Sequence, residues 1–158
     1  MAIVLADLLD PKQVKLDMQA QSAQEAIREL VGILAANGRV PEPKKLSEAV
    51  IQREHENPST VEDGVAFPHA RTDVVETIVL AIGRSQAGIQ FWRNPAAAHL
   101  LFLIGVPKRL VGDYLVCVGA LARIARNATF RDQLMAATTP EDFIGVLRHA
   151  ASPEGGTI

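Results

Sequence analysis

Apolar side chains recur at helical spacing soon after the start of the chain. Ser22 and Glu25, three residues apart, form a capping box at the head of this stretch. The apolar face that follows consists of Ala26, Ile27, Leu30, Val31 and Leu34. Asn37 and Gly38 then supply a left-handed stop signal. The pattern predicts an amphipathic helix between Ser22 and Gly38.

A second helix is predicted to begin near Pro43 and to end by Asn57. Its buried face holds Leu46, Ala49 and Val50. Arg53 lies seven residues after Leu46, so its guanidinium shares the apolar face and points toward the body of the protein. Burying an unpaired guanidinium is costly, so this side chain requires a carboxylate or an anion. The residues alone leave a salt bridge and a phosphate contact open, because the planar fork suits both.

The pattern changes between residues 64 and 106, where short apolar runs are bounded by Pro, Gly, Asn and Ser. It predicts strands at 64–67, 77–83 and 99–106, and a shorter one at 14–18. Residues 100–106 are almost continuously apolar, which is typical of a strand covered on both faces.

Helical patterns return at 113–126 and 130–136 and in a last helix capped by Thr139. Helices on both sides of a central strand block predict an α/β domain whose sheet is covered on both faces.

Composition fits this picture. The chain has 158 residues, 48% of them hydrophobic and 22% charged, which suits one globular domain. We expect that domain to span residues 1–151 and the segment 152–158 to be a disordered tail.

Charge and apolar content narrow the function. The net charge is −2 and no Lys/Arg-rich run occurs, so we expect no nucleic-acid partner. The longest apolar stretch, Ala96–Val106, is too short to span a bilayer, and no secretory signal is recognisable at the start. A single cysteine, Cys117, excludes an internal disulfide and fits a reducing compartment. We therefore expect a cytoplasmic protein without direct membrane insertion.

The segment Gly64–Arg71 is the best candidate for chemistry. A buried-type strand leads into Pro68, which restricts the backbone on both sides, and His69 follows at once. Groups that face ligands tend to lie at such strand ends in α/β sheets. A neutral imidazole is nucleophilic near pH 7 and can be held by a hydrogen bond to its other nitrogen. A surface or structural histidine is the alternative that the residues leave open.

The other reactive residue types give weaker signals. His55 is adjacent to Arg53, and neighbouring helical residues point apart. His149 is expected to complement a helix dipole, His99 to be structural or to line the site, and Cys117 to pack in the core. No cluster has metal-ligand spacing and no nucleotide-type glycine loop occurs, so we expect neither metal nor cofactor.

The run Arg53–Arg71 resembles the signature of the type 2 enzyme IIA family of the bacterial phosphotransferase system, which includes fructose, mannitol and nitrogen-regulatory members. That signature has an Arg-Glu pair, a small hydroxyl residue, a glycine-containing turn and then Ala-aliphatic-Pro-His. Asp7–Pro11, Ser22–Gly38 and Leu101–Pro107 also resemble the family.

The resemblance implies a mixed sheet flanked by helices and a phosphoryl carrier. His69 would accept phosphate from HPr or its nitrogen-branch counterpart. The phosphorylated protein would pass this group to an enzyme IIB, or its phosphorylation state would be a signal to a regulatory target. Arg53 would neutralise the phosphoryl charge, Ser59 would donate to a phosphoryl oxygen, and Gly64 would let the turn approach closely. A regulatory member of the nitrogen branch is favoured over a sugar-transport component, because no IIB or membrane domain is attached.

Two positions depart from the family pattern. Tyr114 stands where many members have a second histidine; it can donate a hydrogen bond but cannot carry positive charge. Glu62 stands where glycine is common and would bring negative charge near the phosphate. These departures favour the alternative function, a regulatory binding module that keeps the fold but does not transfer phosphate. Sugar specificity, regulatory target and oligomeric state do not follow from the sequence.

Overall fold

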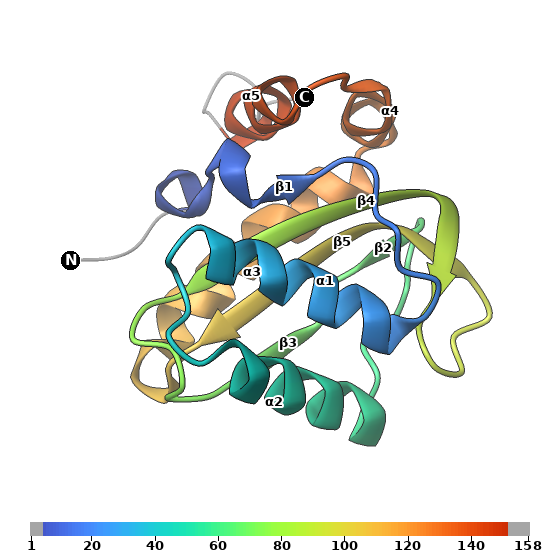
Figure 1. The fold of residues 1–158 in the computed structure, drawn as a ribbon. Helices are drawn as coiled ribbons and strands as arrows, with labels where there is room; N and C mark the ends of the chain where they lie inside the picture. Colours follow the sequence, from blue (N-terminus) through green and yellow to red (C-terminus); the bar gives the residue numbers. More distant parts are fainter. Residues whose placement is uncertain (1–4, 152–158) are drawn as a thin grey trace.

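The computed structural model describes residues 5–151, which form a five-stranded mixed sheet between two layers of helices (Figure 1). The strand order is β1-β4-β5-β2, and β3 also pairs with β5. β4 and β5 are antiparallel, β1 is parallel to β4, and β2 and β3 are parallel to β5. The strands are β1 (Val14–Lys15), β2 (Val65–Ala66), β3 (His69–Arg71), β4 (Val79–Gln90) and β5 (Ala97–Val106). The mixed α/β fold is as expected.

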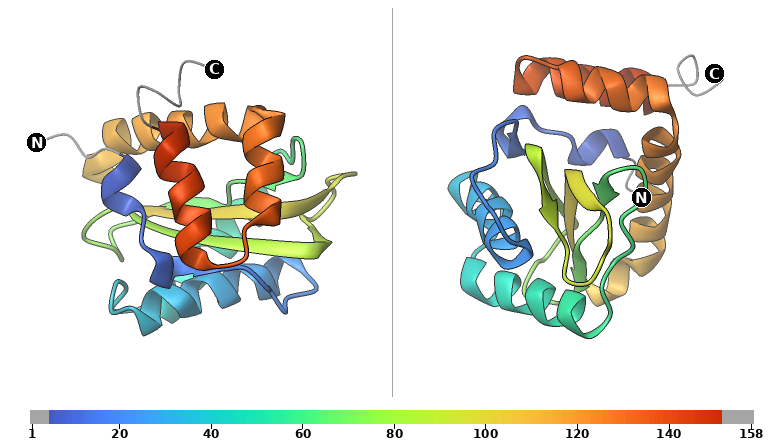
Figure 2. Two further views of the ribbon diagram at one scale, coloured as in Figure 1. Left: turned by 90° about the horizontal axis from the view of Figure 1, so that it is seen from above. Right: turned by 90° about the vertical axis from the view of Figure 1, so that its right-hand side faces the viewer.

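The helices divide between the two faces of this sheet (Figure 2). One face carries α1 (Ala23–Ala36) and α2 (Pro43–Glu56). The other carries α3 (Val111–Arg126), α4 (Ala128–Ala136) and α5 (Pro140–Ala151). Three short 3-10 helices complete the described elements: η1 (Leu5–Leu8), η2 (Pro11–Gln13) and η3 (Lys108–Leu110).

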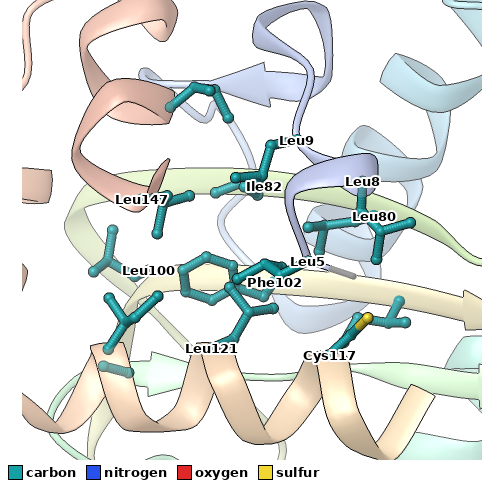
Figure 3. Packing of buried hydrophobic residues seen from close by; sticks show 14 of the residues in the cluster. Leu5, Leu8, Leu9, Leu80, Ile82, Leu100, Phe102, Cys117, Leu121 and Leu147 are labelled. Atoms are coloured by element: carbon teal, nitrogen blue, oxygen red, sulfur yellow. The ribbon is translucent and has the colours of Figure 1, made fainter. Parts of the chain in front are cut away.

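The central strand β5 supplies side chains to both layers. Leu100, Phe102 and Ile104 face the α3–α5 side, where they join the cluster shown in Figure 3. Leu101 and Leu103 face α1 and α2. All five are buried, as predicted for a strand covered on both faces. The site described below therefore lies on a rigid, close-packed support.

The helix signals of the sequence are confirmed. Ser22 Oγ accepts from the Glu25 amide at 3.2 Å, and Gly38 adopts a left-handed φ of 68° after α1. Thr139 Oγ1 accepts from the Asp142 amide at 3.0 Å at the start of α5. The two N-caps satisfy amides, and the turn at Gly38 satisfies carbonyls, that have no partner within the helix.

The strand predictions are less accurate at their ends. The strand predicted to stop at Gly83 continues to Gln90, with a register irregularity between Arg84 and Ile89. β1 has only two residues, and the second short strand after Pro68, β3, was not expected. The predicted tail 152–158 lies outside the described residues.

In the described range 5–151, every helix is too short or too polar to cross a lipid bilayer.

Candidate functional site

The predicted nucleophile lies on the edge of the sheet, between the end of α2 and the start of α3 (Figure 1). The edge strand is interrupted at Phe67 and Pro68 and resumes at His69, whose register partner on β5 is Ile104. The Ile104 amide donates to the Pro68 carbonyl at 3.0 Å, which anchors the interruption itself. His69 thus opens a new strand, whereas the sequence predicted that it follows the end of one.

One backbone carbonyl determines which nitrogen of His69 can react. Nδ1 lies 2.9 Å from the Phe67 carbonyl oxygen. A carbonyl can only accept, so Nδ1 carries the proton and donates it, and the lone pair of the neutral ring lies on Nε2. The side chain is 19% exposed. A half-buried imidazole held in this way is oriented for nucleophilic attack through Nε2.

Burial lowers the pKa of His69 below its usual value of 6.5. The hydrogen bond to Phe67 and the negative charge of Glu54 oppose that effect, whereas the positive charges of Arg53 and Arg71 add to it. The ring is therefore neutral near pH 7, which is the state a nucleophile requires.

A buried carboxylate, Glu54, organises the α2 side of the site. Its side chain has no exposed surface, and Oε2 lies 3.9 Å from His69 Nδ1. Glu54 accepts from the Ser59 amide at 3.0 Å, from Ser59 Oγ at 2.9 Å and from Arg53 Nη1 at 2.9 Å. Three charge-assisted contacts offset the cost of burying this charge. The carboxylate therefore fixes Arg53 and Ser59 in position relative to the ring.

Glu54 was not among the site residues predicted from the sequence, although the sequence carries a signal for it. Leu46, Val50 and Glu54 are each four residues apart and share the buried face of α2. A carboxylate at the end of an apolar stripe requires partners, which the structure supplies in Arg53 and Ser59.

Arg53 and Ser59 both lie at the site, although their phosphoryl-binding roles stay predictions. The Arg53 side chain is 34% exposed, pairs with Glu54 and also donates to the Asn57 carbonyl. The salt bridge to Glu54 leaves Arg53 able to bind an anion as well, because a guanidinium has five N–H donors. Ser59 Oγ lies 3.2 Å from the Phe67 carbonyl that also accepts from His69.

Tyr114 is the contribution of α3. It is buried, and its ring centroid lies 5.5 Å from that of His69 with the planes tilted by 32°. Burial raises the pKa of its hydroxyl, so the phenol stays protonated and neutral at pH 7. Tyr114 thus forms an uncharged aromatic wall beside His69.

Gly64 and Glu62 lie in the turn before β2. Gly64 has a left-handed φ of 75°, and its carbonyl accepts from the amides of His99 at 2.7 Å and Leu100 at 3.0 Å. The backbone of Gly64 therefore approaches β5 closely. His99 is five residues from Ile104, the partner of His69, about 17 Å along the strand. The negative charge acting on the His69 ring is that of Glu54, and Glu62 is exposed.

The remaining candidates lie apart from this cluster. The ring of His99 contacts the Ser85 carbonyl through Nδ1 at 2.9 Å, a structural role. His55 is exposed on α2, and Cys117 is buried, as expected for a core residue. Burial raises the pKa of the Cys117 thiol. Within residues 5–151 no three His, Cys, Asp or Glu side chains are grouped closely enough to bind a metal ion.

Comparison with known proteins identifies the family. The profile described as "Phosphoenolpyruvate-dependent sugar phosphotransferase system, EIIA 2" matches residues 7–150. The chain belongs to this family. It is therefore a type 2 enzyme IIA domain, and its Pro-His segment occupies the edge strand described above.

Curated relatives include separate and multidomain proteins. The chain is 31% identical over 135 residues to a fructose-specific EIIA component of Haloferax volcanii, covering 85% of this chain and 88% of the relative. It is 26% identical over 144 residues to a fructose-specific EIIABC component of Bacillus subtilis, covering 90% of this chain. The match spans only 23% of that longer protein.

Solved structures share the fold at lower identity. The nitrogen regulatory protein IIA-Ntr of Neisseria meningitidis superposes with a TM-score of 0.78 at 23% identity, covering 90% of this chain and 98% of that one. A mannitol enzyme IIA from Escherichia coli, solved in complex with phosphorylated enzyme IIB, gives a TM-score of 0.76 at 20% identity. That comparison covers 89% of this chain and 96% of the other.

Proposed function

We propose that this enzyme IIA domain is a phosphoryl carrier that uses Nε2 of His69 as the acceptor. The hydrogen bond from Nδ1 to the Phe67 carbonyl carries this proposal, because it leaves a lone pair on Nε2 of a neutral ring. Membership of the phosphotransferase family supports the choice of phosphate as the group transferred.

The transfer requires only two histidines and one phosphoryl group. Nε2 of His69 attacks the phosphorus of a donor phosphohistidine in line with the bond that breaks. One N–P bond forms as the other is lost, and the donor ring recovers its lone pair. Each ring keeps the proton on its other nitrogen, and here the Phe67 carbonyl holds that proton in place. No metal, nucleotide or other cofactor enters this balance.

The surrounding side chains stabilise the transferring group. Arg53 supplies donors and positive charge, and Ser59 Oγ donates to a phosphoryl oxygen after turning from Glu54 or Phe67. Glu54 is a positioning residue, since it holds both of these side chains.

The donor in this proposal is HPr or its nitrogen-branch counterpart, in the cytoplasm. The acceptor is an enzyme IIB or a regulatory target protein. The Escherichia coli relative solved in complex with phosphorylated enzyme IIB supports the first of these acceptors. A nitrogen-regulatory relative of the same fold supports the second.

A second candidate function rests on Tyr114. This neutral side chain packs against His69 at a position where positive charge would stabilise a phosphoryl group. On that basis the domain would control a partner by contact and would not carry phosphate.

Intact-mass analysis separates the two functions. The protein is incubated with phosphoenolpyruvate, enzyme I and either HPr or the nitrogen-branch carrier. We expect an acid-labile gain of one phosphoryl group that His69→Ala abolishes. His55→Ala, which changes an exposed histidine on α2, is the matched control and keeps the gain. No gain with either donor from the folded protein favours the binding module, and Tyr114→His then tests whether a cation restores transfer.

A further inference from the structure

A second arginine lies on the same face of the edge strand as His69. Successive side chains of a strand point to opposite faces, so His69 and Arg71 share one face and Ala70 takes the other. Burial agrees with this alternation: Ala70 belongs to the core under α1 and α2, whereas His69 packs against Tyr114 of α3. The Cα atoms of His69 and Arg71 are thus about 6.6 Å apart, within reach of a long side chain.

The charge of Arg53 is paired with that of a buried carboxylate. Its guanidinium pairs at 2.9 Å with the carboxylate of Glu54, which is fully buried and cannot exchange this partner for water. The pair carries no net charge, although Arg53 acts on the His69 ring more strongly than Glu54 does. A phosphoryl group adds between about 1.5 and 2 negative charges near pH 7, more than this pair can offset.

Arg71 carries the charge that is not balanced. Within residues 5–151, its guanidinium makes neither a hydrogen bond nor an ion pair, and the residue is exposed. Its field nevertheless reaches the site: its positive charge lowers the pKa of both His69 and Tyr114. The charged and titratable groups that act on His69 are Arg53 and Glu54 from α2 and Arg71 from its own strand.

We infer that Arg71 is a second phosphoryl-binding residue of this domain, which supplies the net positive charge for the group on His69. This inference rests on the proposed phosphoryl transfer and adds a residue to it. The Arg53–Glu54 pair then orients the oxygens on the α2 side, and Arg71 neutralises the oxygens that face solvent along the sheet edge. An exposed arginine suits that place, because a guanidinium can donate two parallel hydrogen bonds to two oxygens of one phosphoryl group.

The test uses two donors, so that phosphoryl binding is separated from docking of a donor protein. Arg71→Gln and Arg71→Lys are compared with wild type and with Arg28→Gln, an exposed arginine of α1 on the opposite face of the sheet. Each protein is phosphorylated by HPr and, separately, by phosphoramidate, a small-molecule donor for histidine. The yield and half-life of phosphohistidine are measured by intact mass, and the pKa of His69 by NMR titration without phosphate.

We expect Arg71→Gln to lower the yield with both donors by about three- to tenfold, as loss of one nearby partly screened charge implies. The pKa of His69 rises in the same variant, Arg71→Lys recovers most of the yield, and Arg28→Gln matches wild type. A loss with HPr alone overturns the inference in favour of a docking role. Unchanged yields and an unchanged His69 titration also overturn it.

If the proposed function itself is wrong, the experiment gives a different result. In that case the wild-type protein takes no phosphate from HPr or from the nitrogen-branch carrier. Inorganic phosphate is then the probe, titrated against the His69 NMR signals of wild type and Arg71→Gln. Weaker phosphate binding in the variant supports the charge assignment, and equal binding overturns it.

Discussion

One carbonyl oxygen links the two side chains that matter most at the residue scale. The Phe67 carbonyl accepts from His69 Nδ1 at 2.9 Å and lies 3.2 Å from Ser59 Oγ. Pro68, the next residue, has a restricted backbone, and its own carbonyl accepts from the Ile104 amide of β5 at 3.0 Å, which anchors this segment. The tautomer of His69 is therefore set by a backbone carbonyl and not by a carboxylate. The carboxylate of Glu54 instead accepts from Arg53 and Ser59.

The titration of His69 follows from its burial. Since burial lowers its pKa, we expect the ring to lose its charge below pH 6.5, its ordinary value. Nitrogen-15 NMR of the side chain measures this directly.

The same shift affects stability with a definite sign. Below pH 6.5 the unfolded chain binds this proton more readily than the native one, so stability falls as pH drops through that window and levels off below the native pKa. A midpoint at or above pH 6.5 for His69 would show that burial is not the dominant influence.

Glu54→Gln tests the buried carboxylate. The amide cannot reproduce charge-assisted contacts to both Arg53 and Ser59, so we expect a loss of about 1.5–3 kcal/mol in the free energy of unfolding and slower phosphorylation. Chemical denaturation and the mass assay measure the two effects. Glu56→Gln, an exposed change in the same helix, should leave both values within error. If the Glu54→Gln variant were phosphorylated as fast as the wild type, Glu54 would have no positioning role.

The sequence indicated part of this site. Pro68, His69 and Arg53 carry local signals: a restricted backbone, a nucleophile and a guanidinium on an apolar face. Arg71 had no such signal, because its place beside His69 depends on a strand that resumes after the interruption. Pairing with β5 creates that strand, and no local pattern encodes this pairing.

At the scale of elements, an internal arginine connects β4 to the C-terminal layer. Arg84 is 6% exposed and donates through Nε to the Leu16 carbonyl at 3.2 Å. Nη1 donates to carbonyls at the end of α4, those of Leu134 at 3.0 Å, Met135 at 3.0 Å and Ala137 at 2.7 Å. The negative end of the helix dipole thus compensates the buried charge.

Arg84→Met removes these contacts while keeping an apolar stem of similar length. The carbonyls at the end of α4 lose a charged donor, so we expect a loss of about 1.5–3 kcal/mol in unfolding free energy. Urea denaturation followed by circular dichroism provides the measurement. Arg123→Met, an exposed change on α3, is the control. Equal midpoints for the two variants would mean that Arg84 contributes little to the attachment of α4.

Arg84 also explains why the strand boundary was misjudged. Gly83 followed by Arg84 and Ser85 has the composition of a strand end, yet β4 continues through all three. A side chain at Gly83 would displace that of Met18, and the carbonyls that accept from Arg84 belong to the distant end of α4. Helix ends were predicted better, because capping residues act within a few positions of the end they define.

At the scale of the whole molecule, the site lies where the two helical layers meet the edge of the sheet. α2 provides Arg53 and Glu54 from one layer, α3 provides Tyr114 from the other, and β3 places His69 between them. Both hydrophobic clusters include side chains of β5. Because β3 pairs with β5, this pairing fixes the position of β3 in the sheet. A carrier domain needs this rigidity, because in-line transfer depends on alignment of donor and acceptor.

The central claim is that Nε2 of His69 carries the phosphoryl group, and its most direct test is NMR of the phosphorylated protein. Nitrogen-15 correlation spectra with phosphorus coupling identify which ring nitrogen is bonded to phosphorus. The structure predicts phosphorus on Nε2 and a protonated Nδ1 still bonded to the Phe67 carbonyl. Phosphorus on Nδ1, or a spectrum of His69 that the complete donor system leaves unchanged, would contradict this account.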